Sequence, residues 1–467
     1  MFSPKLNSFA AKISFLAFLF SACASAQALL WNDPRATDGY RLISRLNSNT
    51  SRLIDREGTT VHEWKSDYLL ASVAVLQEDG TLLRNCLMPD NTNFIKSAGG
   101  SGHIEVLDWE GRPVWTFELN TDFEIPHHDV QRMPNGNYLI LSWNRVPPAE
   151  AASRLGVDPN AMGGRGVLFE RILEVRPNYP SGGEIVWEWN VADHIVQDRN
   201  PDWPNYGELY SHPQLVNVHF NALATSPDWF HANAIDYNAQ LDQIVISVRN
   251  YSEVWVIDHS TTSAEAAGHS GGRSGKGGDL LYRWGNPYAW AGGYDYDTKL
   301  GSQHNAQWIR PGLPGAGDIL VFVNNEYNRP TESAVVEFTP PIDENGAYPM
   351  NTEDGTWGPK GYSWFYSSPI EGEFFSDFIS GAQRLPNGNT FICSGAQGNI
   401  FEVNPEGEVL WKFAERGENE APVVWLFRSG FYAPDYSGLI GTPLYQAPPP
   451  PTEPAPEPES AAKAVKR

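Results

Sequence analysis

LPNGNTFICSGAQGNIFEVNPEGEVLWKF, residues 385–413, is the stretch of this chain that decides its fold. A Pro-Asn-Gly-Asn turn leads into an apolar strand, and a second strand carrying a glutamate follows. After a Pro-Glu-Gly turn, a third strand carries a tryptophan. Short runs of β-branched and aromatic residues between such turns are typical of β-strands. The stretch therefore predicts three consecutive strands.

Five other segments repeat this phrase with insertions of different length. Each copy has a glycine-bearing turn, an apolar strand, a strand with a carboxylate and a strand with an aromatic residue. The six copies span residues 40–64, 78–118, 133–190, 241–285, 317–368 and 385–413. With its leading strand, each unit supplies about four strands, as a propeller blade does. The sequence predicts an all-β protein, a six-bladed β-propeller with long inter-strand loops.

Composition excludes other classes of fold. Gly (42 residues) and Pro (36 residues) are too frequent for a helical solenoid, and a helical period is missing. A β-sandwich would not explain the repeated phrase. Three long segments, 147–167, 191–230 and 260–278, have no strand pattern. Loops of this length in a compact domain tend to cover an active site or to be disordered.

Charge limits the partners. The chain has 56 acidic and 33 basic residues, which gives a formal net charge of −23. Such a surface repels nucleic acid and anionic lipid, so we expect no nucleic-acid partner. After the first 26 residues the chain has no long apolar segment, so we expect no membrane span. The sequence does not determine the oligomeric state.

The two ends differ from the repeats. In residues 1–26, Lys5 and Lys12 precede the apolar run ISFLAFLF and a small-residue site, Ala24-Ser25-Ala26, as in a secretory signal peptide. Lipidation at Cys23 is the alternative reading. We expect a periplasmic or secreted protein, with the propeller in residues 27–446 and a disordered, Pro/Glu-rich tail in 447–467.

Two cysteines remain in the expected mature chain, too few for a disulfide framework. Cys86 and Cys393 follow glycine turns in the second and sixth units. They therefore fall on corresponding strands of two blades that blade one separates. We expect two free, buried thiols.

Four units are preceded by a strand that begins with polar residues. These leading strands read HHDVQRM from His127, HANAIDY from His231, HNAQWI from His304 and ISGAQRL from residue 379. Innermost strands line the central channel of a propeller, and small-molecule sites form where their ends converge. We expect His231, His304 and either His127 or His128 to meet near the axis. His128 fits the spacing of the fifth unit, and His127 that of the fourth.

Three polar side chains accompany these histidines. Arg249 ends the apolar run QIVISVRN, where a buried guanidinium requires an anion or a carboxylate partner. Asn233 follows His231 by two residues, and Ser380 opens the leading strand of the sixth unit. We expect Arg249, Asn233 and Ser380 to bind substrate. The remaining histidines share no register.

The segments HHDVQRMPNGNYLILSW, HANAIDYN with ISVRN, and QHNAQWI resemble the bacterial arylsulfotransferase family. Its members are periplasmic six-bladed propellers that do not use the nucleotide sulfate donor. The likeness covers most of residues 40–413, and its most specific part is the histidine of a His-x-Asn followed after eighteen residues by arginine, His231 to Arg249. By this resemblance His304 becomes sulfated, while His231, Arg249 and one of His127 and His128 hold the sulfuryl group. The chain lacks the two closely spaced cysteines and the N-terminal β-domain of the enterobacterial type.

The resemblance implies transfer of a sulfuryl group from a phenolic sulfate ester to a phenolic acceptor through a sulfohistidine intermediate. A neutral imidazole can attack sulfur, and no metal or cofactor is needed. A metal-dependent, lactonase-like propeller hydrolase and a non-catalytic ligand-binding propeller are the alternatives, because fold does not fix function. Arg249 would repel a metal cation bound among the histidines. The sequence names neither the natural donor nor the natural acceptor.

Overall fold

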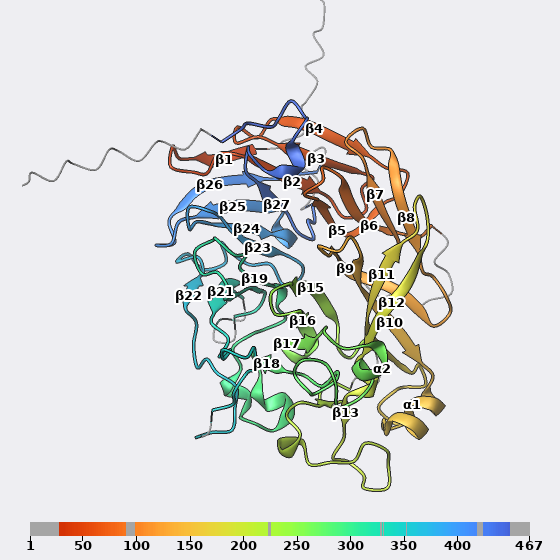
Figure 1. Cartoon of the computed structure of the whole chain (residues 1–467). Coiled ribbons are helices and arrows are strands. Elements are labelled where there is room, and N and C mark those ends of the chain that lie inside the picture. Colours follow the sequence, from red (N-terminus) through yellow and green to blue (C-terminus); the bar gives the residue numbers. More distant parts are fainter. Residues whose placement is uncertain are drawn as a thin grey trace, which may run out of the picture.

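The strands of the chain form a ring of six sheets, as Figure 1 shows. A computed structural model describes residues 28–448 except 90–98, 223–225, 327–328, 330, 352 and 418–423. The expected signal segment, 1–26, and the expected tail from residue 449 lie outside the described residues. The prediction of an all-β, six-bladed propeller is confirmed.

The first three blades, each from its innermost strand outward, use the N-terminal part of the chain and its C-terminal strand. Blade one consists of β27 (Gly430–Tyr432), β2 (Tyr40–Ser44), β3 (Thr50–Ile54) and β4 (Thr60–Lys65), and blade two of β5 (Leu70–Leu76), β6 (Leu82–Leu87), β7 (Gly102–Leu107) and β8 (Pro113–Glu118). Blade three consists of β9 (Glu124–Arg132), β10 (Tyr138–Val146), β11 (Val167–Pro177) and β12 (Gly183–Asn190).

The other three blades, in the same inside-to-outside order, complete the ring. Blade four consists of β15 (Ala232–Asn238), β16 (Gln243–Val248), β17 (Glu253–Asp258) and β18 (Tyr282–Trp284). Blade five consists of β19 (His304–Trp308), β20 (Ile319–Val323), β21 (Ala334–Phe338) and β22 (Trp364–Tyr366). Blade six consists of β23 (Gly381–Arg384), β24 (Thr390–Ser394), β25 (Asn399–Val403), β26 (Val409–Ala414) and β1 (Ala28–Asn32).

Both ends of the described chain close the ring. The C-terminal strand β27 pairs with β2 and becomes the innermost strand of blade one. The N-terminal strand β1 pairs with β26 and becomes the outermost strand of blade six. The first repeat in the sequence has no leading strand before it, because the innermost strand of blade one comes from the far end of the chain. Closure from both ends covers two sheet edges that would otherwise be exposed.

A tryptophan on the fourth strand of every blade ties that blade to the next. Its indole N–H donates to a carbonyl in the turn between the third and fourth strands of the following blade. The six bonds are Trp64 to Asp108 (3.1 Å), Trp115 to Gly182 (2.9 Å), Trp189 to Gly278 (2.7 Å), Trp284 to Pro359 (2.8 Å), Trp364 to Pro405 (2.9 Å) and Trp411 to Arg56 (2.7 Å). The aromatic position of the repeat therefore connects blades as well as filling their cores.

The innermost strands are linked in a second ring near the axis. A side-chain oxygen on one strand accepts a bond from a backbone N–H of the innermost strand of the next blade. These pairs are Asp129 with Ile235 (3.1 Å), Asp236 with Trp308 (2.9 Å), Asn305 with Ala382 (3.0 Å) and Gln383 with Phe431 (2.9 Å). The bonds satisfy backbone donors that lack a ladder partner on the channel side. They hold the starts of blades three to six in fixed relation.

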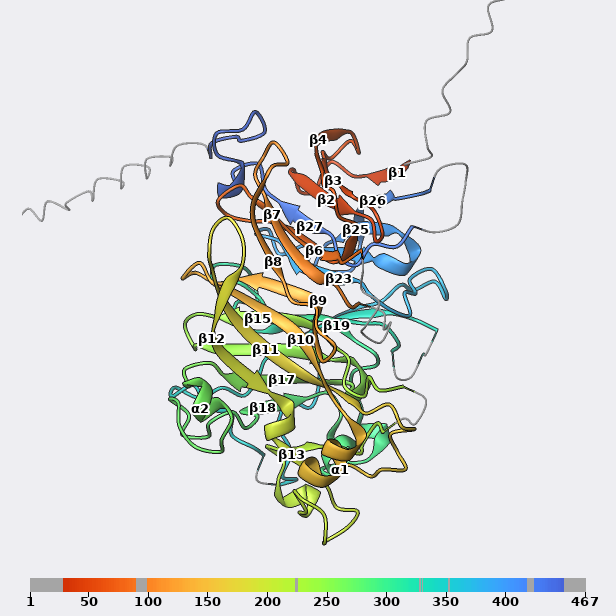
Figure 2. The ribbon, with the colours of Figure 1, turned by 90° about the vertical axis from the view of Figure 1, so that its right-hand side faces the viewer.

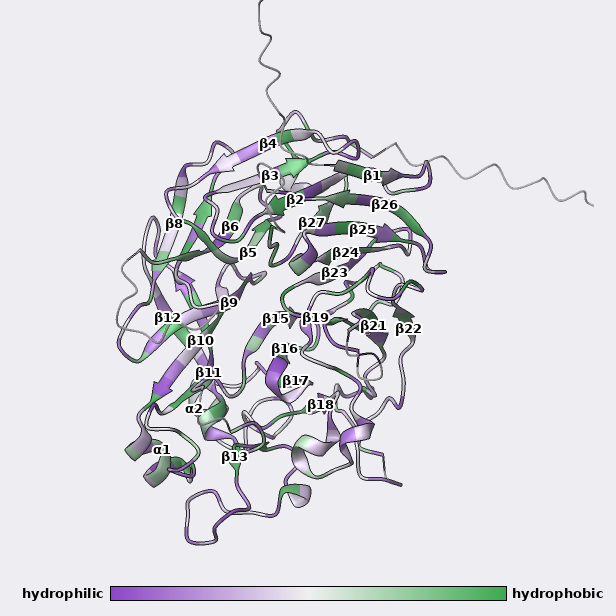
Figure 3. Ribbon diagram, turned by 180° about the vertical axis from the view of Figure 1, so that it is seen from behind, coloured by the Kyte–Doolittle hydropathy of each residue, from purple (hydrophilic) through white to green (hydrophobic). Residues whose placement is uncertain are grey.

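The cores of the blades follow the prediction. Trp115, Trp187, Trp189 and Trp411 are buried, and hydrophobic residues recur along the strands around the ring in Figure 3. Cys86 lies on β6 and Cys393 on β24, each the second strand of its blade, and both are buried and free. The prediction of two free, buried thiols in corresponding strands is confirmed.

The long insertions add structure to the rim of blades three and four. They carry α1 (Pro148–Leu155), α2 (Ser263–Ala266) and the two-stranded parallel sheet of β13 (Ile195–Val196) and β14 (Val216–Asn217). The 3₁₀ turns are η1 (Val191–Asp193), η2 (Leu209–Ser211), η3 (Arg249–Tyr251), η4 (Pro287–Trp290), η5 (Asp295–Asp297), η6 (Gly395–Gln397) and η8 (Ser437–Leu439). Figures 1 and 2 show α1, α2 and β13 at one end of the molecule, away from β27 and β2.

Candidate active site at the axis of the propeller

The expected histidines lie at the starts of the innermost strands of blades four and five and, in blade three, at the bulge within β9. At this end the pairing of β9, β15 and β19 with the second strand of each blade shifts register. His128, His231 and Asn305 have positive φ angles of 49°, 57° and 55°. Bulges re-aim side chains, and left-handed non-glycine residues concentrate at functional sites. The three irregular strands bring imidazoles from different blades together.

His128 lies between two other imidazoles. Its Nδ1 atom is 2.8 Å from the Nδ1 atom of His127, and its ring centroid is 4.5 Å from that of His231. His127 stacks on Trp143 with a centroid separation of 4.1 Å, and its Nε2 atom is 2.9 Å from a carboxylate oxygen of Glu170. His127 is thus held from behind by an indole and a carboxylate, while His128 faces the imidazole of the next blade.

Burial lowers the pKa of His128 well below its usual value, and four neighbouring side chains lower it further. These groups are His231, His127, His304 and Arg249. The same groups were expected at the axis from their register in the repeats, and the structure brings them together. Their proximity makes the site an anion-binding environment with a neutral imidazole at its centre.

His304 has a defined tautomer. Its Nδ1 atom is 2.7 Å from Oδ1 of Asn324 and 3.1 Å from the carbonyl oxygen of Ser302. The orientation of the Asn324 amide is set because its Nδ2 atom donates to the carbonyls of Ser376 and Ile379, at 2.7 and 2.8 Å. Both atoms that face Nδ1 are therefore acceptors, so Nδ1 carries the proton. The lone pair of neutral His304 is on Nε2.

The Nε2 atom of His304 faces the start of blade six. It accepts a bond of 3.2 Å from the backbone N–H of Ile379, a residue with a φ of 53°. Burial lowers the pKa of His304 well below its usual value, and the charge of Arg249 lowers it further. The ring of Phe427 packs near His304 and His128, at centroid separations of 6.4 and 6.1 Å. His304 is a buried, neutral imidazole with an apolar wall at its side.

His231 is oriented by a carboxylate from the preceding loop. Its Nδ1 atom lies 2.6 Å from Oδ2 of Asp228, an arrangement that directs Nε2 away from the loop. The His231 side chain is 17% exposed, whereas His128 and His304 are 4% and 3% exposed as residues. The site therefore has its solvent contact on the side of His231.

Arg249 begins η3 directly after β16. Its backbone N–H donates to the carbonyl of His231 at 3.1 Å, which couples the two residues across blade four. Burial lowers the pKa of Arg249, with the carboxylates of Asp228 and Asp377 acting against that shift. Its guanidinium donates to Asn250 at 3.0 Å and forms no ion pair with a carboxylate in the described part of the chain. A half-buried cation of this kind is prepared for an external anion.

The two remaining expected residues make contacts within the protein. Nδ2 of Asn233 donates to the carbonyl of Gln303 at 2.7 Å and so positions the residue before His304. Oδ1 of Asn233 is buried and has no hydrogen-bond partner among the described residues. The hydroxyl of Ser380 lies 2.8 Å from that of Ser376 and accepts from the Gly395 N–H at 2.9 Å. Ser380 therefore braces the segment that contains Ile379.

Sequence reasoning missed Asn324, Asp228 and Phe427. Asn324 had a signal in the repeat, because VFVNN of blade five aligns with ISVRN of blade four and sets Asn324 opposite Arg249. Asp228 lies in an insertion without strand pattern. Phe427 precedes a strand too short to be found in the sequence. No feature of the sequence pattern therefore pointed to Asp228 or Phe427.

The family model for arylsulfotransferase (ASST) matches residues 47–422 of the chain. The chain belongs to the arylsulfotransferase family. The match covers blades one to six apart from the strands β1, β2 and β27, and it includes every histidine of the site. The sequence-based recognition of the family is thereby confirmed, and membership implies a sulfotransferase that acts on small aryl substrates.

Two solved structures match the chain at low identity and with TM-scores below 0.5. A protein of unknown function from Bacteroides caccae matches with 12% identity and a TM-score of 0.44, covering 84% of this chain and 98% of its own. The β-propeller domain of Cps50 (Swd1) from Myceliophteria thermophila matches with 8% identity and a TM-score of 0.42, covering 88% and 97%. No curated protein matches the sequence. The family assignment rests on the family model alone.

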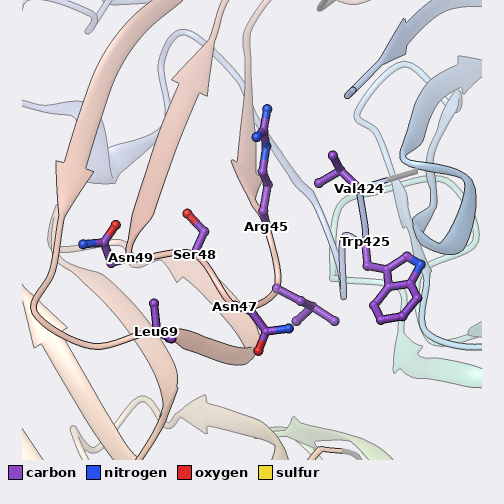
Figure 4. A pocket seen from close by; sticks show the side chains of 8 residues that line it. Arg45, Asn47, Ser48, Asn49, Leu69, Val424 and Trp425 are labelled. Carbon is purple, nitrogen blue, oxygen red and sulfur yellow. The ribbon is translucent and has the colours of Figure 1, made fainter. Parts of the chain in front are cut away.

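A hollow opens beside the site at the junction of blades one and two (Figure 4). It has a volume of about 510 Å³ and is lined by Arg45, Leu46, Asn47, Ser48, Asn49, Leu69, Val424 and Trp425. The ring of Trp425 lies edge-on to that of Phe378 at 5.3 Å. Ile379, which follows Phe378 in the chain, contacts His304.

None of the helices in the described part of this arylsulfotransferase is long and apolar enough to cross a membrane.

Proposed function

We propose that this arylsulfotransferase family member transfers a sulfuryl group from an aryl sulfate to a phenolic acceptor, with Nε2 of His304 as the nucleophile. The observation that carries the proposal is the fixed tautomer of His304. Asn324 and Ser302 hold the proton on Nδ1, so Nε2 needs no deprotonation before it attacks, and the sulfate has only to displace the long hydrogen bond from the Ile379 N–H.

In the first half-reaction Nε2 of His304 attacks sulfur, an N–S bond forms and the bond between sulfur and the phenolic oxygen breaks. The sulfuryl oxygens carry negative charge throughout, and Arg249 supplies a guanidinium that has no ion pair with a described carboxylate. Positive groups aimed at a developing anion in a buried site stabilise the transition state strongly. Burial of the group also keeps competing water away from the N–S bond.

His231 of blade four transfers the proton in both half-reactions. Asp228 engages Nδ1 of His231, so Nε2 of His231 is the atom that gives a proton to the leaving phenolate. In the second half-reaction the same atom takes the proton of the acceptor phenol as its oxygen attacks sulfur. The N–S bond then breaks and neutral His304 is restored. His128, neutral through burial, lies against His231 and completes the wall of the anion site.

The hollow in Figure 4 supports an aromatic substrate. Trp425 and Leu69, which line it, are 48% and 45% exposed and so offer apolar surface to an aromatic ring. Asn47 and Asn49 offer amide groups to phenolic hydroxyls. An aromatic ring lodged there would stack near Trp425, on the far side of Phe378 from His304.

The proposal is tested with p-nitrophenyl sulfate as donor, in the presence and absence of added phenol. Protein quenched with donor alone should gain one SO₃ group on the peptide that contains His304. Release of p-nitrophenol should accelerate when phenol is added. Plots of reciprocal rate against reciprocal donor concentration, at several phenol concentrations, should give parallel lines. His304→Ala should abolish both the adduct and the transfer.

His212→Ala is the matched control, because His212 contacts the Glu208 carbonyl at the rim and lies outside the cluster. This variant should keep full activity. An adduct on another residue, or transfer by His304→Ala at the normal rate, would contradict the role of His304. Steady hydrolysis that ignores phenol would favour a hydrolase, and a lack of any donor turnover would favour a binding propeller.

A further inference from the structure

The glycine- and serine-rich segment after β17 carries few apolar anchors. In α2, the only regular element of this segment, Ala266 is the buried residue. The segment is nevertheless ordered against the outer strand of blade three, where Trp189 donates to the carbonyl of Gly278 at 2.7 Å. Arg273 and Lys276 project from it as exposed side chains. So small an apolar contact leaves hydrogen bonds, such as those that the backbone N–H groups of Ser260 and Ser274 donate to Asp258, to hold the segment, and a further link would stabilise it against local opening.

Three metal-ligating side chains converge at the base of this segment. Nδ1 of His269, within the segment, is 2.7 Å from Oδ1 of Asp279. Nδ1 of His194, which follows η1 in blade three, is 2.9 Å from the same oxygen. The three donor atoms all lie within 4.8 Å of one another. This cluster is built on elements other than those that carry the sulfuryl site.

Hydrogen bonding at His194 determines which of its atoms can bind a cation. Its Nε2 atom is 2.7 Å from the carbonyl oxygen of Ala266, which can only accept, so Nε2 carries a proton. In a neutral His194 the lone pair is then on Nδ1 and faces a carboxylate oxygen. Two acceptors face each other unless a cation or a second proton lies between them. A backbone carbonyl that holds the outer N–H is the usual support of a metal-bound histidine.

We propose that His194, His269 and Asp279 bind a divalent transition-metal ion of the zinc type. Two imidazoles and one carboxylate are a ligand set that Zn²⁺ accepts, and water fills the fourth position. The exposure of His269, 62% for its side chain, leaves that position open to solvent. Bonds of about 2.0–2.1 Å require ligand atoms roughly 3.3 Å apart. Oδ1 of Asp279 lies 2.9 Å from His194 and 2.7 Å from His269, so binding requires the Asp279 carboxylate and the exposed His269 ring each to move by a few tenths of an ångström.

The function of this metal is to fasten the segment 260–278 to blade three. One ligand comes from the segment, one from its C-terminal boundary and one from the loop after β12. The metal bridges them where apolar contact is scarce, so binding favours the closed segment over its locally opened forms. It takes no part in sulfuryl transfer.

Limited trypsin digestion of the full chain tests the proposal. Cleavage after Arg273 and Lys276 requires the segment to open. Cleavage of the wild-type protein at these two sites should be slow with Zn²⁺ and at least about tenfold faster after EDTA treatment and dialysis, by analogy with the effect of removing support from a metal site. The dialysed protein should bind one equivalent of Zn²⁺, measured by competition with a chromophoric chelator.

His269→Ala should lose the zinc binding and the protection by zinc, and it should fold because the side chain is exposed. Ser270→Ala is the matched control, since it removes an exposed side chain from the next position without removing a ligand. Equal cleavage of wild-type protein with Zn²⁺ and EDTA would overturn the proposal. Trypsin cleavage that depends on pH but not on zinc would also overturn it. That result would indicate an ion pair between protonated His194 and Asp279 in place of a metal site.

Discussion

His304 and Asn324 meet through Nδ1 and Oδ1, 2.7 Å apart, and this contact decides which ring nitrogen of His304 is left unprotonated. Asn324 follows β20, the strand beside β19, so blade five supplies both the histidine and the residue that orients it. Because the amide is fixed by two carbonyls from the segment before blade six, it cannot flip to present Nδ2 to His304. Asn324 is a positioning residue.

Asn324→Leu tests this role. The variant keeps the side-chain volume but removes the acceptor for the Nδ1 proton, so His304 can rotate or adopt the other tautomer. We expect the rate of sulfation by p-nitrophenyl sulfate to fall on the order of 10²-fold, as for loss of one oriented polar group. The KM for donor should change little, because Asn324 does not contact the sulfate.

Asn325→Ala is the control for the same turn, since Asn325 has no hydrogen bond to a histidine of the described chain. It should keep the normal rate. A rise in KM with unchanged kcat for Asn324→Leu would show that the residue shapes the binding site and does not orient the nucleophile.

The first half-reaction should be insensitive to pH where an ordinary histidine titrates. The pKa values of His304 and His128 lie well below the usual value through burial and neighbouring positive charge. Both rings therefore stay neutral through about pH 6.5, the value for an unperturbed histidine. With p-nitrophenyl sulfate, whose phenolate leaves without needing a proton from His231, single-turnover sulfation should be flat from pH 8 to about 6.5 and should fall only in more acid solution. A half-maximal rate near pH 6.5 would contradict this.

The same shifts predict how stability depends on pH. Unfolded histidines bind protons as pH falls below about 6.5, while the folded rings stay neutral to lower pH. The unfolded state then binds more protons, so the free energy of unfolding falls as pH drops through this window. Urea unfolding at pH 7.5 and 5.5 measures the effect. His304→Ala should show a weaker loss, because it removes one of the two groups.

Much of the fold could be predicted because it depends on local sequence patterns that recur in every blade. The tryptophan of each repeat marked the blade cores, and Trp411 and its five counterparts also connect each blade to the next. Strands β1 and β27 could not be predicted in the same way. They are short, they lie at opposite ends of the chain, and their place in the sheets depends on closing the ring.

The candidate site could be predicted as a set of residues but not as a geometry. The register of the repeats placed His231 and His304 at equivalent strand starts. It could not separate His127 from His128, because neighbouring residues on a regular strand face opposite ways and the bulge in β9 breaks that rule. The structure sets His128 against His231 and backs His127 with Trp143.

Arg249→Lys should severely impair transfer although the positive charge is kept. A guanidinium presents two parallel donors to sulfuryl oxygens, and one ammonium cannot reproduce that contact. We expect kcat/KM for p-nitrophenyl sulfate to fall roughly 10²–10³-fold. Arg112→Lys is the control, because Arg112 is exposed and pairs with Asp108 at the surface. An equal effect of both substitutions would rule out a specific contact.

The two thiols should be unreactive in the folded protein. Burial raises the pKa of Cys393 to about 12 and that of Cys86 well above its usual value, so neither forms a thiolate at neutral pH. Ellman's reagent should detect no thiol in the native chain from residue 27 onward and two after denaturation. A count of zero after denaturation would indicate a disulfide, which the separation of blades two and six does not permit.

Trp425→Ala should change which acceptors are used. Trp425 contacts Phe378, and it is the next residue, Ile379, that bonds His304, so we expect a phenol with a single ring not to reach Trp425, whereas an acceptor with a second aromatic ring does. Loss of one aromatic contact costs about 0.5–1.5 kcal/mol. We therefore expect kcat/KM for a two-ring phenol to fall up to about tenfold, with that for phenol nearly unchanged. Trp31→Ala, on the outermost strand of blade six, removes an indole of similar exposure and should affect neither acceptor. Equal losses for both phenols would place Trp425 in the support of the fold near His304, and no loss for either would remove the hollow from the substrate path.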